Sequence, residues 1–209
     1  MISFTCDSCG KTFKVPDEFA GRSARCKGCG AKLTVPLPAS ALEEAAAALK
    51  PAKVPMRVRR MMADAQAMAA MFRDFPLIRV QAVAGDPAEV YHVEFDINGL
   101  QRGADGKPSP RQQHKAEIQL TSEYPRVGPK CKMLTPIFHP NIDPATICVG
   151  DHWTAGERLA DLVVRIGQMI AYQEYNIKSP LDAEAAMWAD LNAKNLPVDS
   201  RDLHPPGMQ

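Results

Sequence analysis

Four cysteines near the N-terminus restrict the fold of the first 36 residues more than any other feature of the chain. They form two Cys-x-x-Cys pairs, Cys6/Cys9 and Cys26/Cys29, with 16 residues between the pairs. This spacing is typical of four-cysteine zinc sites. So short a segment buries too little apolar surface to fold alone, whereas structural zinc contributes about 10–16 kcal/mol of coupled binding and folding. We therefore predict a zinc ribbon over residues 1–36, with these cysteines as ligands of a structural zinc ion.

The ribbon carries basic side chains that could contact a partner. Four thiolates around one zinc ion leave a net charge of about −2, which partly offsets the cations. Aromatic side chains for base stacking are nearly absent, so a solvated or protein-docking face is favoured over a nucleic-acid site. The basic residues are Lys11, Lys14, Arg22, Arg25, Lys27 and Lys32.

Residues 37–55 are rich in proline and alanine and predict a semi-rigid linker. Within it, Ser40 and Glu43 form a capping box for a short helix that extends to about Lys50.

Residues 56–209 read as a second domain. Apolar residues recur at helical spacing over 56–72 and again over 157–172, while the segments between them alternate as strands joined by Gly, Pro and Asp turns. We expect an α+β fold in which an antiparallel meander packs against helices. The strands are predicted at 78–83, 90–97, 115–120 and 130–134.

The overall composition points to a cytoplasmic chain. Apolar residues make up 45% of it and the formal net charge is +1. It has no apolar run of about 18 residues, and no basic-then-apolar leader precedes Cys6, so we expect neither a membrane span nor a secretory signal. The six cysteines consist of two metal-binding pairs and two distant thiols. This arrangement favours metal binding in a reducing compartment over a framework of disulfide bonds.

A chemically suggestive stretch combines a stiff turn with a thiol. Pro140 fixes its own backbone and biases His139 toward an extended conformation. The carboxamide of Asn141 can then brace the loop or donate to a developing oxyanion. Cys148 ends a strand-like segment at a rim, and a thiol beside an amide is what acyl transfer through a thioester requires. Cys131, by contrast, alternates with Met133 and is interpreted as a core thiol.

These residues occur within a longer pattern that resembles the catalytic core of ubiquitin-conjugating enzymes, and the whole chain resembles a bacterial type with an N-terminal zinc ribbon. Five features match in order and approximate spacing. They are Tyr-Pro-x-x-x-Pro at 124–129, His-Pro-Asn at 139–141, Ile147-Cys148, Trp153, and Pro-Leu-x-x-x-x-Ala at 180–186.

The resemblance implies a UBC-like fold and a transferase. Cys148 would carry a ubiquitin-like protein as a thioester, received from an activating enzyme and passed to a lysine amine, with a ligase as a further partner. Asn141 would stabilise the oxyanion or the loop. Ser179, just before Pro180, would orient the acceptor, with Asp182 the nearest carboxylate in sequence; His139 is a further candidate that is mainly structural in its turn.

The chain departs from the family pattern in two places. The family's usual Gly-Pro hairpin is replaced by a longer, polar loop over 98–110, and the chain ends soon after the helix that starts near Leu181, so its usual final helix is expected to be missing. Both differences concern partner recognition more than chemistry.

Two other functions remain open. A non-catalytic adaptor could bind ubiquitin-like proteins or nucleic acid, although the retention of Cys148 argues against it. A cysteine hydrolase would need His152 or His139 within hydrogen-bond reach of the Cys148 sulfur. Thioester exchange replaces one thiolate by another and needs no such base, so a transfer enzyme is the favoured prediction.

Overall fold

The computed structural model describes residues 1–38, 54–149 and 153–208. The chain divides into two compact units, Met1–Lys53 and Val54–Gln209, which are described separately. The predicted helix from Ser40 to about Lys50 lies outside the described residues, as does most of the predicted linker.

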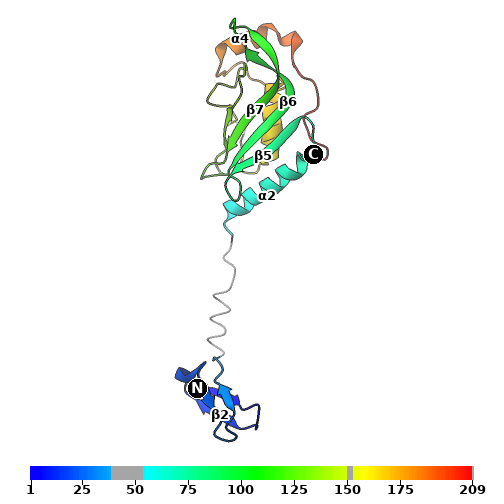
Figure 1. Cartoon of the computed structure of the whole chain (residues 1–209). Helices are drawn as coiled ribbons and strands as arrows, with labels where there is room; N and C mark the ends of the chain where they lie inside the picture. The colour runs from blue at the N-terminus through cyan, green and yellow to red at the C-terminus, as the bar shows by residue number, and fades with distance from the viewer. Residues whose placement is uncertain (39–53, 150–152, 209) are drawn as a thin grey trace. The chain divides into compact units, whose positions relative to one another are not determined.

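The N-terminal unit consists of two antiparallel hairpins (Figure 1). Strands β1 (Ile2–Thr5) and β2 (Thr12–Val15) form the first, and β3 (Ser23–Arg25) and β4 (Lys32–Thr34) form the second. A 3-10 turn, η1 (Asp17–Phe19), follows β2. Each hairpin turn holds one cysteine pair. The two turns lie next to each other in the folded unit, which brings all four thiols together.

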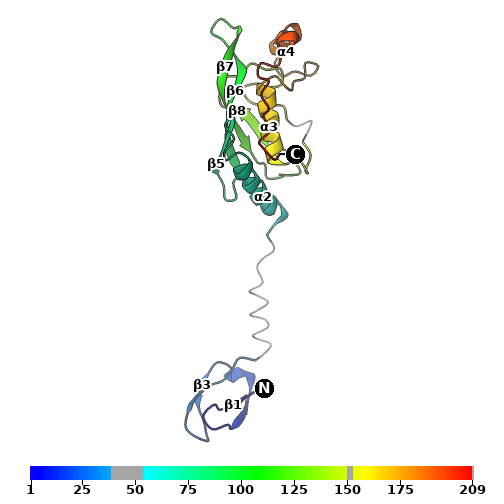
Figure 2. The same cartoon turned by 90° about the vertical axis from the view of Figure 1, so that its right-hand side faces the viewer.

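The larger unit contains one antiparallel sheet in the order β5-β6-β7-β8. Its strands are β5 (Ile78–Ala84), β6 (Val90–Arg102), β7 (Pro108–Gln119) and β8 (Lys130–Met133). Its helices are α2 (Met56–Met71), α3 (Leu159–Ile170) and α4 (Ala183–Leu191), with a 3-10 turn η3 (Ala193–Asn195). The predicted α+β meander is confirmed, and α3 lies along one face of the sheet (Figure 2).

The core forms between β6 and α3. Alternate β6 residues, including Val93 and Phe95, point inward and are buried against an apolar helix face that includes Leu162 and Ile166. Apolar side chains recur every second residue along the strand and about every 3.6 residues along the helix, so each element has one apolar face, and the two faces pack as two layers. No helix among the described residues is both long enough and apolar enough to cross a membrane.

The hairpin between β6 and β7 differs from the predicted long loop. Strand β6 continues through a bulge between Asp96 and Gly99 to Arg102, β7 begins at Pro108, and only residues 103–107 form the turn. Most side chains of this extension are polar, so the sequence shows no alternation of apolar and polar residues from which the strands could be predicted. At Gly99 a Cβ would lie 2.6 Å from Nε2 of His114, so this position has no room for a side chain. The extension delivers Leu100, whose carbonyl accepts a 2.8 Å hydrogen bond from the amide of Phe138, beside the His-Pro-Asn turn.

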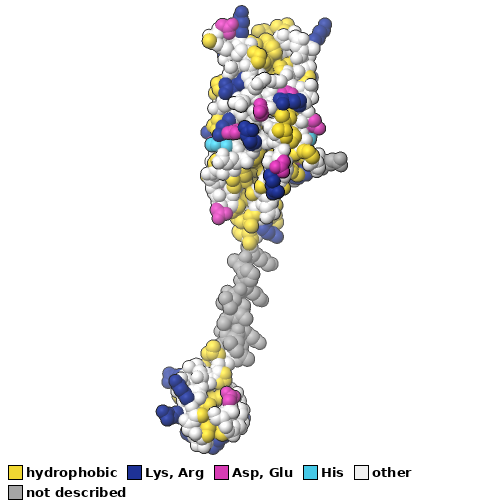
Figure 3. Space-filling model, turned by 45° about the vertical axis from the view of Figure 1, so that its right-hand side comes forward, with side chains coloured by type: hydrophobic (Ala, Val, Ile, Leu, Met, Phe, Trp, Pro, Cys, Tyr) yellow, Lys and Arg dark blue, Asp and Glu magenta, His cyan; other side chains and the backbone are white. Residues whose placement is uncertain are grey.

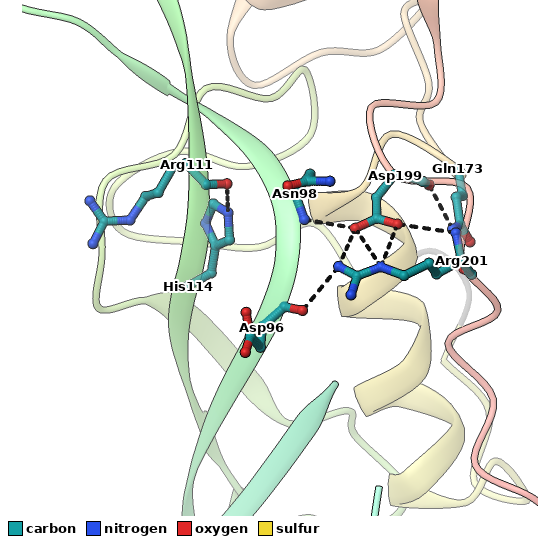
Figure 4. Close-up of polar contacts among 7 residues, drawn as sticks. All are labelled: Asp96, Asn98, Arg111, His114, Gln173, Asp199 and Arg201. Carbon is teal, nitrogen blue, oxygen red and sulfur yellow. Dashed lines mark hydrogen bonds and ion pairs between the residues drawn. The ribbon is translucent and has the colours of Figure 1, made fainter. Parts of the chain in front are cut away.

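Within the described residues no α-helix follows α4, and the chain instead continues as a tail that packs on the β6 bulge (Figure 4). The bulge leaves the amide of Asn98 without a strand partner, and this amide donates to the Asp199 carboxylate at 2.8 Å. Arg201 pairs with the same carboxylate at 2.6 Å and donates to the carbonyl of Asp96 at 3.1 Å. Gln173, just after α3, donates to the carbonyl of Asp199 at 2.9 Å. The tail therefore joins the sheet to the end of α3.

We expect Asp199→Ala to lower the free energy of unfolding by about 2 kcal/mol. Arg201 beside the buried carboxylate holds the pKa of Asp199 at about 2, below its ordinary value of 3.8. Because the folded pKa is lowered, this contribution is present above about pH 4 and is lost as the pH falls toward 2. Urea unfolding of wild type and variant at pH 7 and pH 3 measures both effects.

The exposed Asp202 provides the control in the same tail. Asp202→Asn should change the free energy of unfolding by less than about 0.5 kcal/mol, as exposed substitutions usually do. Equal losses for Asp199→Ala and Asp202→Asn would contradict the anchoring role of Asp199.

Candidate active site and cysteine cluster

The His-Pro-Asn turn and Cys148 are held together by backbone hydrogen bonds. Ile142 forms isolated antiparallel bridges with both His139 and Ile147, which folds the segment back on itself. The amide of Cys148 then donates to the carbonyl of Asn141 at 3.0 Å, and the amide of Ile147 donates to the carbonyl of Cys131 at 2.9 Å. Cys148 is half-buried at the end of this short extended segment, next to Asn141.

The carboxamide of Asn141 is fully engaged in bracing a loop. Its Oδ1 accepts a hydrogen bond from the amide of Asn176 at 2.7 Å. Its Nδ2 donates to the carbonyl of Asn176 at 2.8 Å and to that of Ser179 at 3.4 Å. Of the two roles left open by the sequence, this geometry favours the loop brace over the oxyanion donor.

The buried side chain of His139 supports the turn through a hydrogen bond with its backbone. Its side chain is completely buried, and its Nδ1 accepts a 3.1 Å hydrogen bond from the amide of Asn141. Its ring packs edge-on against Tyr172, with ring centroids 4.8 Å apart. Burial lowers the pKa of His139 to about 3, so the imidazole is neutral near pH 7 and is suited to orienting Asn141 rather than to carrying protons.

Tyr172 reverses the direction of the chain after α3, so that the following residues lie near Cys148. Directly after α3 it adopts a left-handed conformation with φ of 57°, which costs a non-glycine residue roughly 1–2 kcal/mol. Its hydroxyl donates to the carbonyl of Phe138 at 2.7 Å, and its ring packs against Trp188. These contacts offset the strain and direct residues 173–179 toward Asn141.

A second network fixes the loop between Cys148 and α3. The Nε of Trp153 donates to the carbonyl of Pro125 at 2.8 Å, and the Trp153 and Tyr124 rings lie 5.7 Å apart. Arg60 on α2 pairs with the buried Asp64 at 2.7 Å and donates to the carbonyl of Ala155 at 2.7 Å. Helix α2 therefore contributes directly to the position of the segment that follows the thiol.

A cavity of about 240 Å³ adjoins Cys148. It is lined by Asn141, Cys148, Arg165, Met169, Glu174, Tyr175, Asn176 and Ser179. Three of the four predicted catalytic candidates, Cys148, Asn141 and Ser179, thus share one cavity, whereas His139 is not among its lining residues.

Sequence reasoning missed two charged residues in this cavity. Arg165 interrupts the apolar run from Leu162 to Ile166, and a lone charge in such a run was a signal that could have been used. Glu174 lies in the loop after α3, where nothing in the sequence pattern places it beside the thiol. Asp182, suggested earlier as the nearest carboxylate, instead caps α4 by accepting from the amide of Ala185 at 3.0 Å.

The other candidate thiol, Cys131, does not line this cavity. Cys131 is buried on β8, and desolvation raises the pKa of its thiol to about 12, in keeping with a core role. His152, which the hydrolase alternative considered, lies outside the described residues. No histidine is among the described residues that line the cavity.

The four N-terminal cysteines have the geometry of a tetrahedral thiolate site. Their sulfur atoms all lie within 4.8 Å of one another. The Cys6–Cys29 and Cys9–Cys26 sulfur pairs are 3.8 and 3.6 Å apart. A tetrahedral zinc ion with bonds of about 2.3 Å requires sulfur separations of about 3.8 Å, so the cluster fits zinc. The amide of Gly28 donates to the Cys26 sulfur at 3.3 Å, as an outer hydrogen bond to a metal ligand would.

Lys and Arg side chains are visible on the surface of the ribbon (Figure 3). All six of the basic residues named above are exposed, and Arg22 lies 5.5 Å from the Phe19 ring centroid. These contacts are those of a solvated face and do not single out a ligand.

Comparisons with known proteins address the larger unit. The family model described as "Ubiquitin-conjugating enzyme" matches residues 79–197. A curated relative, "Ubiquitin-conjugating enzyme E2 21" of Caenorhabditis elegans, is 30% identical over 118 residues, which cover 51% of this chain and 53% of the relative. The chain thus spans about half the length of that relative.

Two solved structures are also similar to the chain. A putative ubiquitin conjugating enzyme from Plasmodium yoelii is 16% identical, covers 68% of this chain and 89% of its own, and has a TM-score of 0.49. A second, described as "Novel Ubiquitin-Conjugating Enzyme", is 19% identical, covers 68% of this chain and 94% of its own, and has a TM-score of 0.48.

Proposed function

Because the chain belongs to the ubiquitin-conjugating enzyme family, we propose that it carries a ubiquitin-like protein as a thioester on Cys148 and transfers it to a lysine amine. The observation that carries the proposal is the cavity in which the half-buried thiol lies with an amide, a hydroxyl and a carboxylate. Such a cavity can hold an acyl group on the thiol while an amine enters from solvent.

The proposed transfer forms one bond and breaks another. The neutral amine nitrogen attacks the thioester carbonyl carbon, the tetrahedral intermediate collapses, and the Cys148 sulfur leaves as a thiolate while the nitrogen loses a proton. A lysine amine has an ordinary pKa near 10.4, so it must be deprotonated for attack. Glu174, the carboxylate of the cavity lining, would attract the ammonium and accept its proton, while Ser179 would orient the amine.

The neighbouring residues would act through position. Asn141 holds the 176–179 segment against the thiol by three hydrogen bonds. His139 holds the backbone of Asn141 in turn. We assign neither residue a proton-transfer step, because one is a neutral amide and burial lowers the pKa of the other to about 3.

The partners and the compartment that we propose are those expected from the sequence. The proposed partners are a ubiquitin-like protein, an activating enzyme and a ligase, in a cytoplasmic pathway of bacterial type. Thiols that must stay reduced to bind metal and form thioesters support a reducing compartment. The ribbon would be a structural zinc module whose four thiolates leave no position for a reacting water.

We expect a thiol-sensitive adduct on Cys148 when the chain is mixed with ATP, an activating enzyme and a ubiquitin-like protein from the same genome. Cys148→Ser should give at most a thiol-resistant oxyester, because its alkoxide replaces the sulfur. Cys131→Ser is the matched control and should load like wild type, since that thiol is buried in the core. Non-reducing gels and intact mass measure the adduct; an adduct that persists in Cys148→Ala and disappears in Cys131→Ser would refute the assignment.

We expect Asn141→Ala to act as a structural lesion. The substitution leaves the amide and carbonyl of Asn176 without their partners, so the free energy of unfolding should fall by about 1–3 kcal/mol. Loading of Cys148 and discharge to free lysine should slow together. Thermal melts and single-turnover rates provide the measurement, with Asn192→Ala at the end of α4 as a control that should not change the rates.

A different result would reassign Asn141. If discharge alone slows by about 10²- to 10³-fold while the melt is unchanged, Asn141 is an oxyanion donor rather than a brace.

We expect one tightly bound zinc per chain. Chelation should unfold residues 1–36 while the larger unit keeps its melting transition, because the ribbon has little core without metal. Elemental analysis and circular dichroism of chelated protein test this, and Cys9→Ser should lower the zinc content in the same way as chelation. Less than half an equivalent of zinc in protein purified without chelator would contradict the assignment.

A further inference from the structure

Arg165 is a charged residue in a place where the helix buries apolar ones. It lies on α3 between the buried residues Val164 and Ile166, and its side chain is only 16% exposed. Glu157, itself 13% exposed, lies 2.9 Å from its Nη2. A buried cation is costly unless it is paired and hydrogen-bonded, so its retention calls for a reason beyond packing.

The ion pair with Glu157 engages Nη2 but leaves Nε without a partner. Within the described part of the chain, Nε of Arg165 is buried and donates to no acceptor. A buried charged donor without an acceptor is destabilising. Such a group calls for an explanation, and a catalytic role is one of those that native structures provide. Arg165 also lines the cavity that contains Cys148.

The carboxamide of Asn141 is not available to a negative charge that develops in this cavity. Its Nδ2 donates to the carbonyls of Asn176 and Ser179. The other donors among the described lining residues, apart from Arg165, are hydroxyl and amide groups, which lack a full positive charge. Among the described lining residues, Arg165 is the one that carries a positive charge, and the other charged residue, Glu174, is a carboxylate.

We propose that Arg165 donates to the carbonyl oxygen of the acyl group on Cys148 and stabilises the oxyanion that forms when a nucleophile attacks it. This inference rests on the proposed transfer at Cys148 and adds a catalytic residue to it. When the nucleophile adds to the carbonyl carbon, the C=O electron pair moves to oxygen, and the guanidinium holds that charge without changing its own protonation. The charge returns to the sulfur when the Cys148 thiolate leaves.

Two reactions of the same thiol separate this role from a general effect on the site. Acylation by the mercaptoethanesulfonate thioester of acetylglycine passes through an oxyanion and releases mercaptoethanesulfonate. Alkylation by iodoacetamide displaces iodide and forms no oxyanion. Because both need the thiolate, the ratio of the two rates at one pH cancels the thiolate fraction. Mass spectrometry of the Cys148 peptide after peptic digestion at acid pH gives both rates.

We expect Arg165→Gln to lower the acylation-to-alkylation ratio by about 10²- to 10³-fold, the usual loss for one oxyanion donor. Arg165→Lys should retain part of the ratio, since it keeps the charge but not the planar fork of donors. Arg158→Gln, the same substitution at the exposed start of α3, is the control and should leave the ratio within about twofold of wild type. The double variant Arg165→Gln/Glu157→Gln removes both buried charges and should show the same loss with a near-wild-type melt.

The outcomes distinguish this inference from the function on which it rests. A wild-type ratio no higher than that of N-acetylcysteine would overturn acyl transfer at Cys148 and the role of Arg165 together. A raised wild-type ratio that both Arg165→Gln and the double variant leave unchanged would overturn the role of Arg165 alone.

Discussion

The structure of the proposed site depends on the hydrogen bonds between the carboxamide of Asn141 and the backbone of Asn176. They join two segments that the sequence separates by 35 residues, the turn before the thiol and the loop after α3. Each side of this connection has its own support: His139 holds the turn, and the strained Tyr172 directs the loop. A side-chain amide carries its acceptor and its donors on separate atoms, so it can satisfy one backbone N–H and one C=O at once, which an ionised carboxylate cannot do; the geometry therefore suits an amide at position 141.

The charges around the thiol are divided in a way that suits transfer between a thioester and an amine. The buried imidazole is neutral, because desolvation lowers the pKa of His139 to about 3. The positively charged Arg165 lies on helix α3, and the negatively charged Glu174 lies in the exposed loop that follows it. An acyl oxygen and an ammonium group would therefore meet opposite charges in one small cavity, in which the helix-borne guanidinium is fixed and the loop-borne carboxylate reaches solvent.

The sequence predicted those parts of the fold that depend on local patterns. The core of each strand, the apolar face of α3 and the cysteine spacing are all short-range signals. It could not predict the extension of β6 and β7, because polar residues occupy both faces of that segment and its one buried anchor, Leu100, contacts Phe138 in another part of the chain. The positions of Arg165 and Glu174 depend on which way their side chains point in the folded protein. Of the site candidates, Cys148, Asn141 and Ser179 were found from local motifs, whereas the hydrogen bonds of Asn141 that bring these segments together are long-range and are not visible in the sequence.

The tail that packs on the β6 bulge has a consequence for the order in which the chain becomes structured. Asn98 is synthesised about a hundred residues before Asp199, the acceptor of its amide, and the core residue Leu203 follows later still. Until Asp199 and Leu203 have emerged from the ribosome, the amide of Asn98 lacks its acceptor and the core lacks one of its side chains. Residues 1–36 require only metal and their own hairpins, so they can fold first. The larger unit, by contrast, reaches its final packing only after Leu203 has emerged, and until then its incomplete core is exposed to non-native contacts.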